Sequence, residues 1–523
     1  MAYVIRSLCR PAPGSLARGL ACVVALWLTL YPPGSAGGIE EEYSERHDSV
    51  LGATFAITLV GLDDGEARRV AAAVLEDVAR LESIFGQAVQ GTVEGEGIQE
   101  KSIQEKNVQG GGGGSELARL NEAGGARSLS PELADLLRLC EHWRRETSGA
   151  FSCRLGTVLD IWREAEQSGE VPERPALRRM ARDLDGLPWQ LAGNGIDLGG
   201  MRLAPGALAA GYAADVALAR ARSLAPGALG IAIDIGGHGI YWGRAGDGEP
   251  WRAAIAERGA GAPDYGALVL DGAAVAYSGG HGQRRVGDRR FSRLISPLDG
   301  WPATFAPRTL VVAKDAATAA ALAQALTAMP MAQGIALIDG LADAEALIVT
   351  ETDKTFASRG WYERLAPDER HRTLWSGDRQ FLVEYQIPAH DIAEYRRPYV
   401  AVWITDSGRK LVRQLAVHGE NSRWLRDIPL WWRRHGRRDE SVIDGLTRAT
   451  PMPGHHALTW DGRDDTGAGV PEGDYILHIE AAREHGGREV LTLPFSVTDK
   501  AFEQKASGAT ELGAVRVSLG SAP

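Results

Sequence analysis

The sequence is poor in cysteine, in long apolar runs and in positive charge. Its 523 residues include 4 cysteines, and a chain of this length is far too large for a peptide hormone or a small disulfide-knotted protein. After the first thirty residues, no stretch is long and apolar enough to span a bilayer. The formal charge of −11 argues against a general nucleic-acid binder, because those proteins carry an excess of lysine and arginine.

The overall composition is that of a folded protein. Hydrophobic residues make up 44% and charged residues 24%, so the chain can bury a core and wholesale disorder is excluded. The length suggests about three folded units, and two larger ones are also allowed. The anomaly is glycine, with 64 residues against a usual share of roughly 7%. The fold therefore uses many glycine turns or carries a low-complexity insert.

The first 36 residues have the pattern of a signal peptide. Three arginines precede an apolar run at residues 19–30, and Ser35 and Ala36 form a small-residue cleavage site. The alternative is an uncleaved anchor. A lipoprotein signal does not fit, because Cys22 lies before most of the apolar run. The protein is thus expected to be periplasmic or otherwise exported, with association with the inner membrane left open.

Removal of this segment leaves two cysteines, Cys140 and Cys153. In an oxidising periplasm they could pair. Two separate buried thiols are an equal alternative, because the sequence cannot show their geometry.

Residues 50–365 alternate β-rich and alanine-rich helical runs, and we expect them to form one large domain. Residues 65–85 are predicted to form a helix, since Val70, Val74, Val78 and Leu81 lie on one apolar face. Strands are predicted at residues 53–60, 230–235 and 309–313. Residues 87–115 hold a near-repeat and five consecutive glycines, which indicates a disordered insertion.

Residues 380–500 are predicted to form a separate all-β domain. Short strands with turn signals at residues 400–404, 410–416 and 475–481 favour an Ig-like sandwich.

Two glycine pairs in the larger part follow predicted strands. Gly199 and Gly200 precede a predicted helix start at residues 211–215, and Gly236 and Gly237 follow residues 233–235. Such a turn lets a phosphate approach backbone N–H groups, and a helix N-terminus favours its charge. Each pair alone is weak, because tight turns use glycine for steric reasons.

Seven segments, in this order along the chain, resemble the bacterial ApbE family. They are residues 115–121 (SELARLN), 148–151 (SGAF), 196–200 (IDLGG), 211–215 (GYAAD), 232–237 (AIDIGG), 276–279 (AYSG) and 296–302 (SPLDGWP). The resemblance implies an α+β domain with T-fold-like mixed layers and an exported FAD:protein FMN transferase.

Members of this family bind FAD and use Mg²⁺ on its diphosphate. They transfer FMN to a Thr or Ser hydroxyl of a partner protein and release AMP. The implied partner is a membrane or periplasmic flavoprotein that carries the acceptor motif D-x-x-[ST]-G-A-[ST], and no nucleic acid is involved.

The resemblance also implies site residues, while the catalytic group stays unknown. Gly200 is placed near the metal through its backbone, and Asp215 is expected to open the helix after the glycine loop, either in the site or as an ordinary carboxylate. The implied flavin-binding residues are Asp197, Gly149, Ala150, Phe151, Gly199, Gly236, Gly237 and Ser278.

Several positions depart from the family pattern. Ala320 and Gln324 stand where the family has an Asp and a Thr that bind the metal, and an alanine methyl offers no oxygen ligand. Ala210 replaces a charged residue, seven residues are inserted before it, and the insertion at 87–115 occupies the place of a flavin-stacking Tyr. The alternative function is therefore a catalytically degenerate flavin-binding or partner-docking protein of a periplasmic redox system.

The second part resembles the DUF2271 family of predicted periplasmic proteins. The resemblance rests on residues 398–404 (PYVAVWI), 424–434 (WLRDIPLWWRR) and 460–467 (WDGRDDTG). The last segment is also similar to the Ig-like repeat of flagellar hook-capping proteins. We expect a hairpin turn there with positive φ at Gly462 and Gly467, and a Ca²⁺ site of three aspartates is the less favoured alternative.

Two further features of this part permit alternatives. Residues 423–438, here called the arginine–tryptophan segment, form a partner-docking surface or equally an amphipathic cover of their own sandwich. Residues 444–450 and 507–510 resemble the flavin acceptor motif, which would make Thr450 or Thr510 a covalent FMN site. The competing interpretation for both is an ordinary loop.

Overall fold

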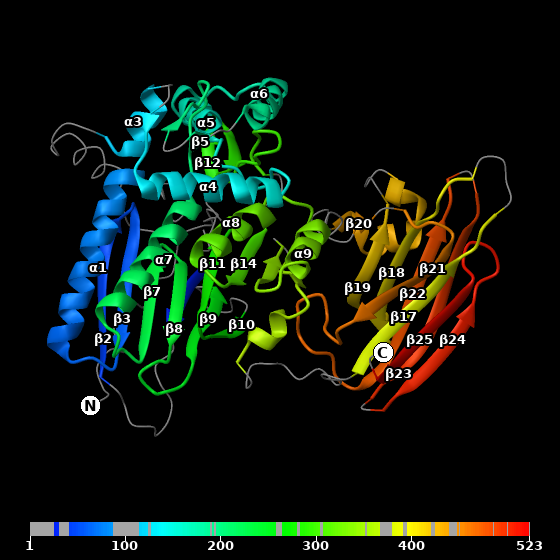
Figure 1. The fold of residues 1–523 in the computed structure, drawn as a ribbon. Helices are drawn as coiled ribbons and strands as arrows, with labels where there is room; N and C mark the ends of the chain where they lie inside the picture. The colour runs from blue at the N-terminus through cyan, green and yellow to red at the C-terminus, as the bar shows by residue number, and fades with distance from the viewer. Residues whose placement is uncertain are drawn as a thin grey trace, which may run out of the picture.

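The computed structural model separates the chain into an α+β part and a β-sandwich, which lie side by side in Figure 1. The structure describes residues 26–30, 41–86, 114–123, 127–188, 191–192, 195–257, 264–279, 283–303, 307–350, 353–366, 379–390, 395–419, 424–438, 447–448, 450–484, 486–498 and 500–521.

An antiparallel sheet of eight strands forms the centre of the α+β part, and it begins before the expected boundary at residue 50. Its spatial order is β16-β15-β14-β11-β8-β7-β3-β2. The strands are β2 (Glu42–Val50), β3 (Ala53–Val60), β7 (Gly230–Ile235), β8 (His238–Gly243), β11 (Ala273–Ser278), β14 (Arg308–Ala313), β15 (Glu345–Val349) and β16 (Thr355–Ala357).

Helices cover one face of this sheet and a smaller sheet covers the other. The helical layer contains α1 (Asp64–Phe85), α7 (Ala207–Leu224) and α8 (Ala316–Leu326), which share a core with the sheet. The second core joins the opposite face to β9 (Trp251–Glu257) and β10 (Asp264–Leu270). The predicted strands β3, β7 and β14 are confirmed.

Helix α1 confirms the sequence prediction at residues 65–85. Asp63 caps it by accepting from the N–H groups of Gly65 and Glu66, both at 2.9 Å. The four residues of the predicted apolar face are all buried. The helix ends at Gly86, whose φ of 72° suits a residue without Cβ.

Part of the expected signal peptide lies within the described residues. Leu26–Leu30 form β1, which pairs antiparallel with β9, whereas residues 1–25 and 31–36 fall outside the described ranges. Within those ranges, no helix has the length and apolar character needed to cross a membrane. The predicted insertion also lies outside them, apart from Gly114 and Ser115.

A small subdomain sits at one end of the α+β part. It contains α5 (Gly156–Ser168), α6 (Arg174–Gly186), β12 (Gln283–Val286) and β13 (Arg289–Ser292), which pack around the buried Trp162. The neighbouring elements are α3 (Glu116–Ala123), α4 (Pro131–Glu146) and a small sheet of β4 (Arg127–Ser128), β5 (Leu191–Ala192) and β6 (Gly195–Ile196), while α9 (Met331–Asp339) lies near β15.

The second part is a sandwich of two sheets with one core between them, and its predicted strands are confirmed. One sheet holds β17 (Arg379–Ile387), β21 (Gly454–Trp460), β24 (Phe502–Ser507) and β25 (Ala514–Ser521); the other holds β18 (Tyr399–Asp406), β19 (Leu411–His418), β20 (Thr447–Arg448), β22 (Gly473–Ala482) and β23 (Arg488–Val497). The sandwich extends past the expected boundary at residue 500, because β25 pairs with β17 and β24.

The two parts meet through residues 353–366, here called the linking segment. The N–H of Thr355 donates to the carbonyl of Asp465 at 2.9 Å. The guanidinium of Arg463 lies 3.7 Å from the ring centre of Tyr362. The turn at residues 461–467 therefore contacts the linking segment directly, and Gly462 and Gly467 have the expected positive φ of 73° and 87°.

Candidate functional site

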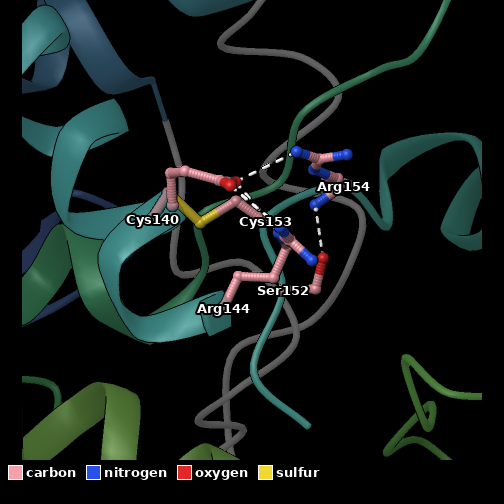
Figure 2. The surroundings of a disulfide bond; sticks show 6 residues. Cys140, Arg144, Ser152, Cys153 and Arg154 are labelled. Atoms are coloured by element: carbon pink, nitrogen blue, oxygen red, sulfur yellow. Dashed lines mark hydrogen bonds and ion pairs between the residues drawn. A yellow bond between two sulfur atoms is a disulfide. The ribbon is translucent and has the colours of Figure 1, made fainter. Parts of the chain in front are cut away.

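A disulfide holds the segment that the family resemblance assigns to flavin binding. Cys140 of α4 pairs with Cys153, with their Cα atoms 5.8 Å apart, so the paired alternative is confirmed. Both cysteines are buried. Figure 2 shows Arg144, Ser152 and Arg154 around this bond. The disulfide ties the loop at residues 147–153 to α4.

The loop between the cysteines has an unusual backbone. Ser148 and Gly149 adopt φ of 52° and 84°, and the hydroxyl of Thr147 accepts from the N–H of Phe151 at 3.0 Å. Ala150 and Phe151 are buried in the main core. Gly149 is thereby left at the surface of a pocket, while the next two side chains anchor the loop.

The pocket lies between this loop and the small subdomain. It brings together the two family segments at residues 148–151 and 296–302, which are far apart in the sequence. Of the predicted flavin residues, all of which the structure describes, Gly149 alone lines it. The lining residues are Gly149, Ser152, Arg154, Leu155, Ala181, Arg182, Leu184, Asp185, Pro297 and Leu298.

A buried carboxylate organises the arginines behind the pocket. Glu141 accepts from Arg154 at 3.0 Å, from Arg144 at 2.9 Å and from Arg145 at 3.0 Å. Burial alone would raise the pKa of Glu141, but the hydrogen bonds and charges of Arg144 and Arg154 outweigh it and lower that pKa to about 2. Glu141 is therefore ionised at neutral pH.

Asp197, Gly199 and Gly200 form an exposed turn after β6. The carboxylate of Asp197 accepts from the N–H of Gly199 at 2.9 Å, and both glycines have positive φ. A Cβ on either glycine would meet no described atom within 4 Å, so their backbone is open to a ligand. The turn is not among the lining residues of the pocket.

The expected helix start at residues 211–215 is wrong, because α7 already begins at Ala207. The inserted residues before Ala210 add the first turn. Gly211 instead permits close packing, since a Cβ there would lie 2.4 Å from the carbonyl oxygen of Ala316 in α8. The segment serves contact between two helices rather than a phosphate at a helix N-terminus.

Asp215 does not open its helix either; it caps the neighbouring one. Its carboxylate accepts from the N–H groups of Ala316 at 2.7 Å and Ala317 at 3.0 Å. Burial raises the pKa of Asp215 to about 7, although these two N–H groups act in the opposite direction. The carboxylate stabilises the start of α8.

The second glycine pair lies in a hairpin turn. Gly236 and Gly237 connect β7 to β8, and the carboxylate of Asp234 accepts from the N–H of Gly237 at 3.1 Å. Ser278 is buried at the end of β11, where its carbonyl accepts from Thr309 at 3.2 Å. The structure brings none of these residues into the pocket at Gly149.

The residues on α8 do not fit a magnesium site. Ala320 is completely buried and presents a methyl group. Gln324 offers a single buried amide oxygen, for which the described residues supply no hydrogen-bond partner. Mg²⁺ prefers six oxygens with one or two carboxylates among the ligands. In the described part of the chain, no group of three or more His, Cys, Asp or Glu side chains could hold a metal.

Sequence reasoning missed the arginines and acids of the pocket. Arg154 directly follows the disulfide loop, Arg182 and Asp185 come from α6, and Glu141 of α4 lies behind the pocket. The one feature of the sequence that indicates these charged residues is the cluster of arginines at residues 174–182, which a search for charge patterns would have found.

The arginine–tryptophan segment covers its own sandwich. Leu425, Ile428 and Trp431 are buried in a core with the outer face of β18 and β22. The carboxylate of Glu480 accepts from the N–H of Trp431 at 2.7 Å, at the start of α10 (Pro429–Arg434). The covering interpretation is therefore confirmed for these apolar residues, and the docking interpretation stays untested for the exposed arginines.

The aspartates of the turn at residues 461–467 form hydrogen bonds within the turn and to the neighbouring strand β19. Asp464 accepts from the N–H groups of Thr466 and Ala468, at 2.8 and 3.0 Å, and Asp465 accepts from the N–H of Gln414 at 2.9 Å. This is the expected hairpin chemistry. For the acceptor-like segments, residues 439–446 and 449 lie outside the described ranges. The N–H and the hydroxyl of Thr510 both donate to the carboxylate of Glu489, at 3.0 and 3.3 Å.

Two family models match the chain. Residues 95–348 match the ApbE family, and residues 380–514 match the family described as predicted periplasmic protein (DUF2271). No curated protein matches the chain.

Solved structures of ApbE proteins resemble the chain at low identity. The ApbE protein of Thermotoga maritima is 21% identical with a TM-score of 0.50, covering 62% of this chain and 100% of its own. The apo flavinyl transferase ApbE of Pseudomonas stutzeri is 20% identical with a TM-score of 0.48, covering 62% and 96%. The first likeness shows a shared fold. The chain therefore belongs to the ApbE family over residues 95–348 and carries a DUF2271 domain over residues 380–514.

Proposed function

We propose that this protein binds FAD and transfers its FMN part to a Thr or Ser hydroxyl of an exported acceptor protein, releasing AMP. Membership of the ApbE family supports the reaction class. The observation that carries the proposal is the pocket, where a disulfide-held glycine loop faces a wall that includes Arg154 and Arg182. Arg154 is paired with Glu141, so Arg182 is the cation of this wall that suits a ligand with a diphosphate.

The reaction is a phosphoryl-type transfer. The hydroxyl oxygen of the acceptor forms a bond to the phosphorus on the FMN side of the diphosphate. The bond from that phosphorus to the bridging oxygen breaks, AMP leaves, and the hydroxyl proton passes to a base or to water. The protein contributes mainly by positioning the reactants and by neutralising the charge that develops on the phosphate oxygens.

The partner and compartment follow from the same proposal. The acceptor would be a membrane or periplasmic flavoprotein with the motif D-x-x-[ST]-G-A-[ST], and residues 1–36 would direct export before removal. The DUF2271 match is described as a predicted periplasmic protein, which supports this compartment. Asp197 and Gly199, on the open turn after β6, would contact the flavin from outside the pocket.

The second candidate is flavin binding without turnover. It is favoured by Ala320 and Gln324, which leave α8 without the carboxylate and hydroxyl of the family pattern. In this case the protein would hold FAD and dock a redox partner.

AMP release distinguishes the two candidates. The full chain is incubated with FAD and an acceptor protein that carries the motif, with and without Mg²⁺. Transfer predicts AMP in the medium and an acceptor heavier by the mass of FMN. FAD binding with neither product would support the second candidate and overturn the first. The double variant Ala320→Asp with Gln324→Thr should then gain activity if only the metal site has been lost.

A further inference from the structure

The pocket wall contains two guanidinium groups with different roles. Arg154 directly follows Cys153 of the disulfide loop, and Arg182 comes from α6. Arg154 is buried, whereas Arg182 is exposed. The contacts of each arginine show which of them has charge to offer a ligand.

Arg154 is fixed by its protein contacts. Its Nη1 donates to the carbonyls of Leu184, Asp185 and Leu187 at 2.8–2.9 Å, and its Nη2 donates to Glu141 at 3.0 Å. These bonds hold the end of α6 against the disulfide loop. Rotation of Arg154 toward a ligand would break them, so we assign it to the framework of the pocket.

The guanidinium of Arg182 has only a weak protein contact within the described part of the chain, so its charge is available to a ligand in the pocket. Its Nε donates weakly to the carbonyl of Arg178, at 3.4 Å. Its natural partner on the helix is Asp185, three residues further on, but the carboxylate of Asp185 is bound by Arg144 at 2.7 Å. Among the residues that the structure describes, no carboxylate forms an ion pair with Arg182. A cationic side chain therefore borders the pocket without a counter-charge.

The residues of α8 do not fit a magnesium site, so a bound phosphate needs its counter-charge from a side chain. A guanidinium presents its N–H groups in a planar fork that matches phosphate oxygens. Building on the proposed function, we propose that Arg182 binds the diphosphate of the flavin dinucleotide, so that binding to this chain requires no divalent cation. Arg182 then contacts the substrate directly, and its charge neutralises the diphosphate in place of the metal that family members use.

Three ligands test the inference by binding alone. The full chain is titrated in EDTA with FAD, with ADP, which carries the diphosphate without the flavin, and with riboflavin, which carries the flavin without phosphate. Arg182→Ala should weaken the binding of FAD and of ADP roughly tenfold or more, as expected for loss of charge-assisted hydrogen bonds. It should leave the binding of riboflavin unchanged. Arg182→Lys should recover part of the loss, because it restores the charge without the fork.

Arg179→Ala is the matched control, since it removes the same charge from an exposed position of α6 that does not line the pocket. It should bind all three ligands like the wild type. The inference is overturned if Arg182→Ala binds FAD and ADP normally, or if its affinity for riboflavin falls as much as its affinity for FAD. It is also overturned if the wild type binds FAD only after Mg²⁺ is added. Absence of wild-type FAD binding under every condition would instead overturn the proposed function.

Discussion

Glu141 shows how much of the candidate site depends on one buried side chain. Its carboxylate accepts from three arginines, and one of them, Arg154, also holds the end of α6. The chain from Glu141 through Arg154 to Leu184 supports the pocket wall without touching its open side. Loss of Glu141 would leave Arg154 buried without a counter-charge, which is costly.

Glu141→Gln should therefore destabilise the protein in a pH-dependent way. The pKa of Glu141 is lowered from 4.5 to about 2 in the folded protein, so its ionised form contributes stability that is complete above pH 4.5. That contribution, on the order of 3 kcal/mol, is lost as the pH falls toward 2. Urea unfolding should show a lower free energy of unfolding for Glu141→Gln than for the wild type at pH 7, and this difference should become smaller below pH 4.5. A difference in the free energy of unfolding that does not change with pH would contradict a stabilising role of the ionised Glu141.

Helix α8 carries the two positions at which the family resemblance predicts side chains that bind a metal. Its start is held by Asp315 as its own cap, through the N–H of Thr318 at 2.8 Å, and by Asp215 from α7. Its later turns carry Ala320 and Gln324. The two caps therefore fix the start of the helix, and neither Ala320 nor Gln324 offers a carboxylate or a hydroxyl.

Asp215→Ala should loosen this helix. The change leaves two buried N–H groups without their acceptor, which costs about 1–3 kcal/mol. Asp215→Asn is the matched comparison, because it keeps one acceptor oxygen and should lose less. The free energy of unfolding, measured by urea titration at pH 8, checks both. Equal stability of the alanine variant and the wild type would show that Asp215 does not hold α8.

The elements with strong local patterns were predictable from the sequence. The apolar face of α1 and the β-rich runs of β3, β7 and β18 depend on neighbours along the chain. The start of α7 at Ala207 was not predictable from the sequence, because an alanine-rich insertion carries no helix-start signal. Only a small part of the pocket was predicted: Gly149 lies in a family motif, whereas Arg182 and Asp185 reach the pocket only through the packing of α6 beside Trp162.

At the scale of the whole molecule, the two parts share a tight contact. Gly467, in the turn of the sandwich, has φ of 87°, and a Cβ there would lie 2.7 Å from the hydroxyl oxygen of Thr355 in the linking segment. Phe356 of that segment packs against cores of both parts. The turn that resembles a hook-capping repeat therefore joins the sandwich to the ApbE-type domain.

Gly467→Ala should uncouple the two parts. The methyl group strains the backbone and pushes against Thr355, whereas Gly248→Ala introduces a similar positive-φ strain, at φ of 79°, in open space. In calorimetry, the Gly467 variant should separate the unfolding transitions of the two parts more than the Gly248 variant does. Identical behaviour of the two variants would contradict a coupling role for this turn.

The most direct test of the account is a titration of the full chain with FAD, followed by flavin fluorescence in EDTA and again after addition of Mg²⁺. The pocket at Gly149 and Arg182 predicts a saturable fluorescence change at one FAD per chain in EDTA, with little further effect of Mg²⁺. A titration with no saturable change in either condition would contradict the central claim that this ApbE-family domain binds FAD.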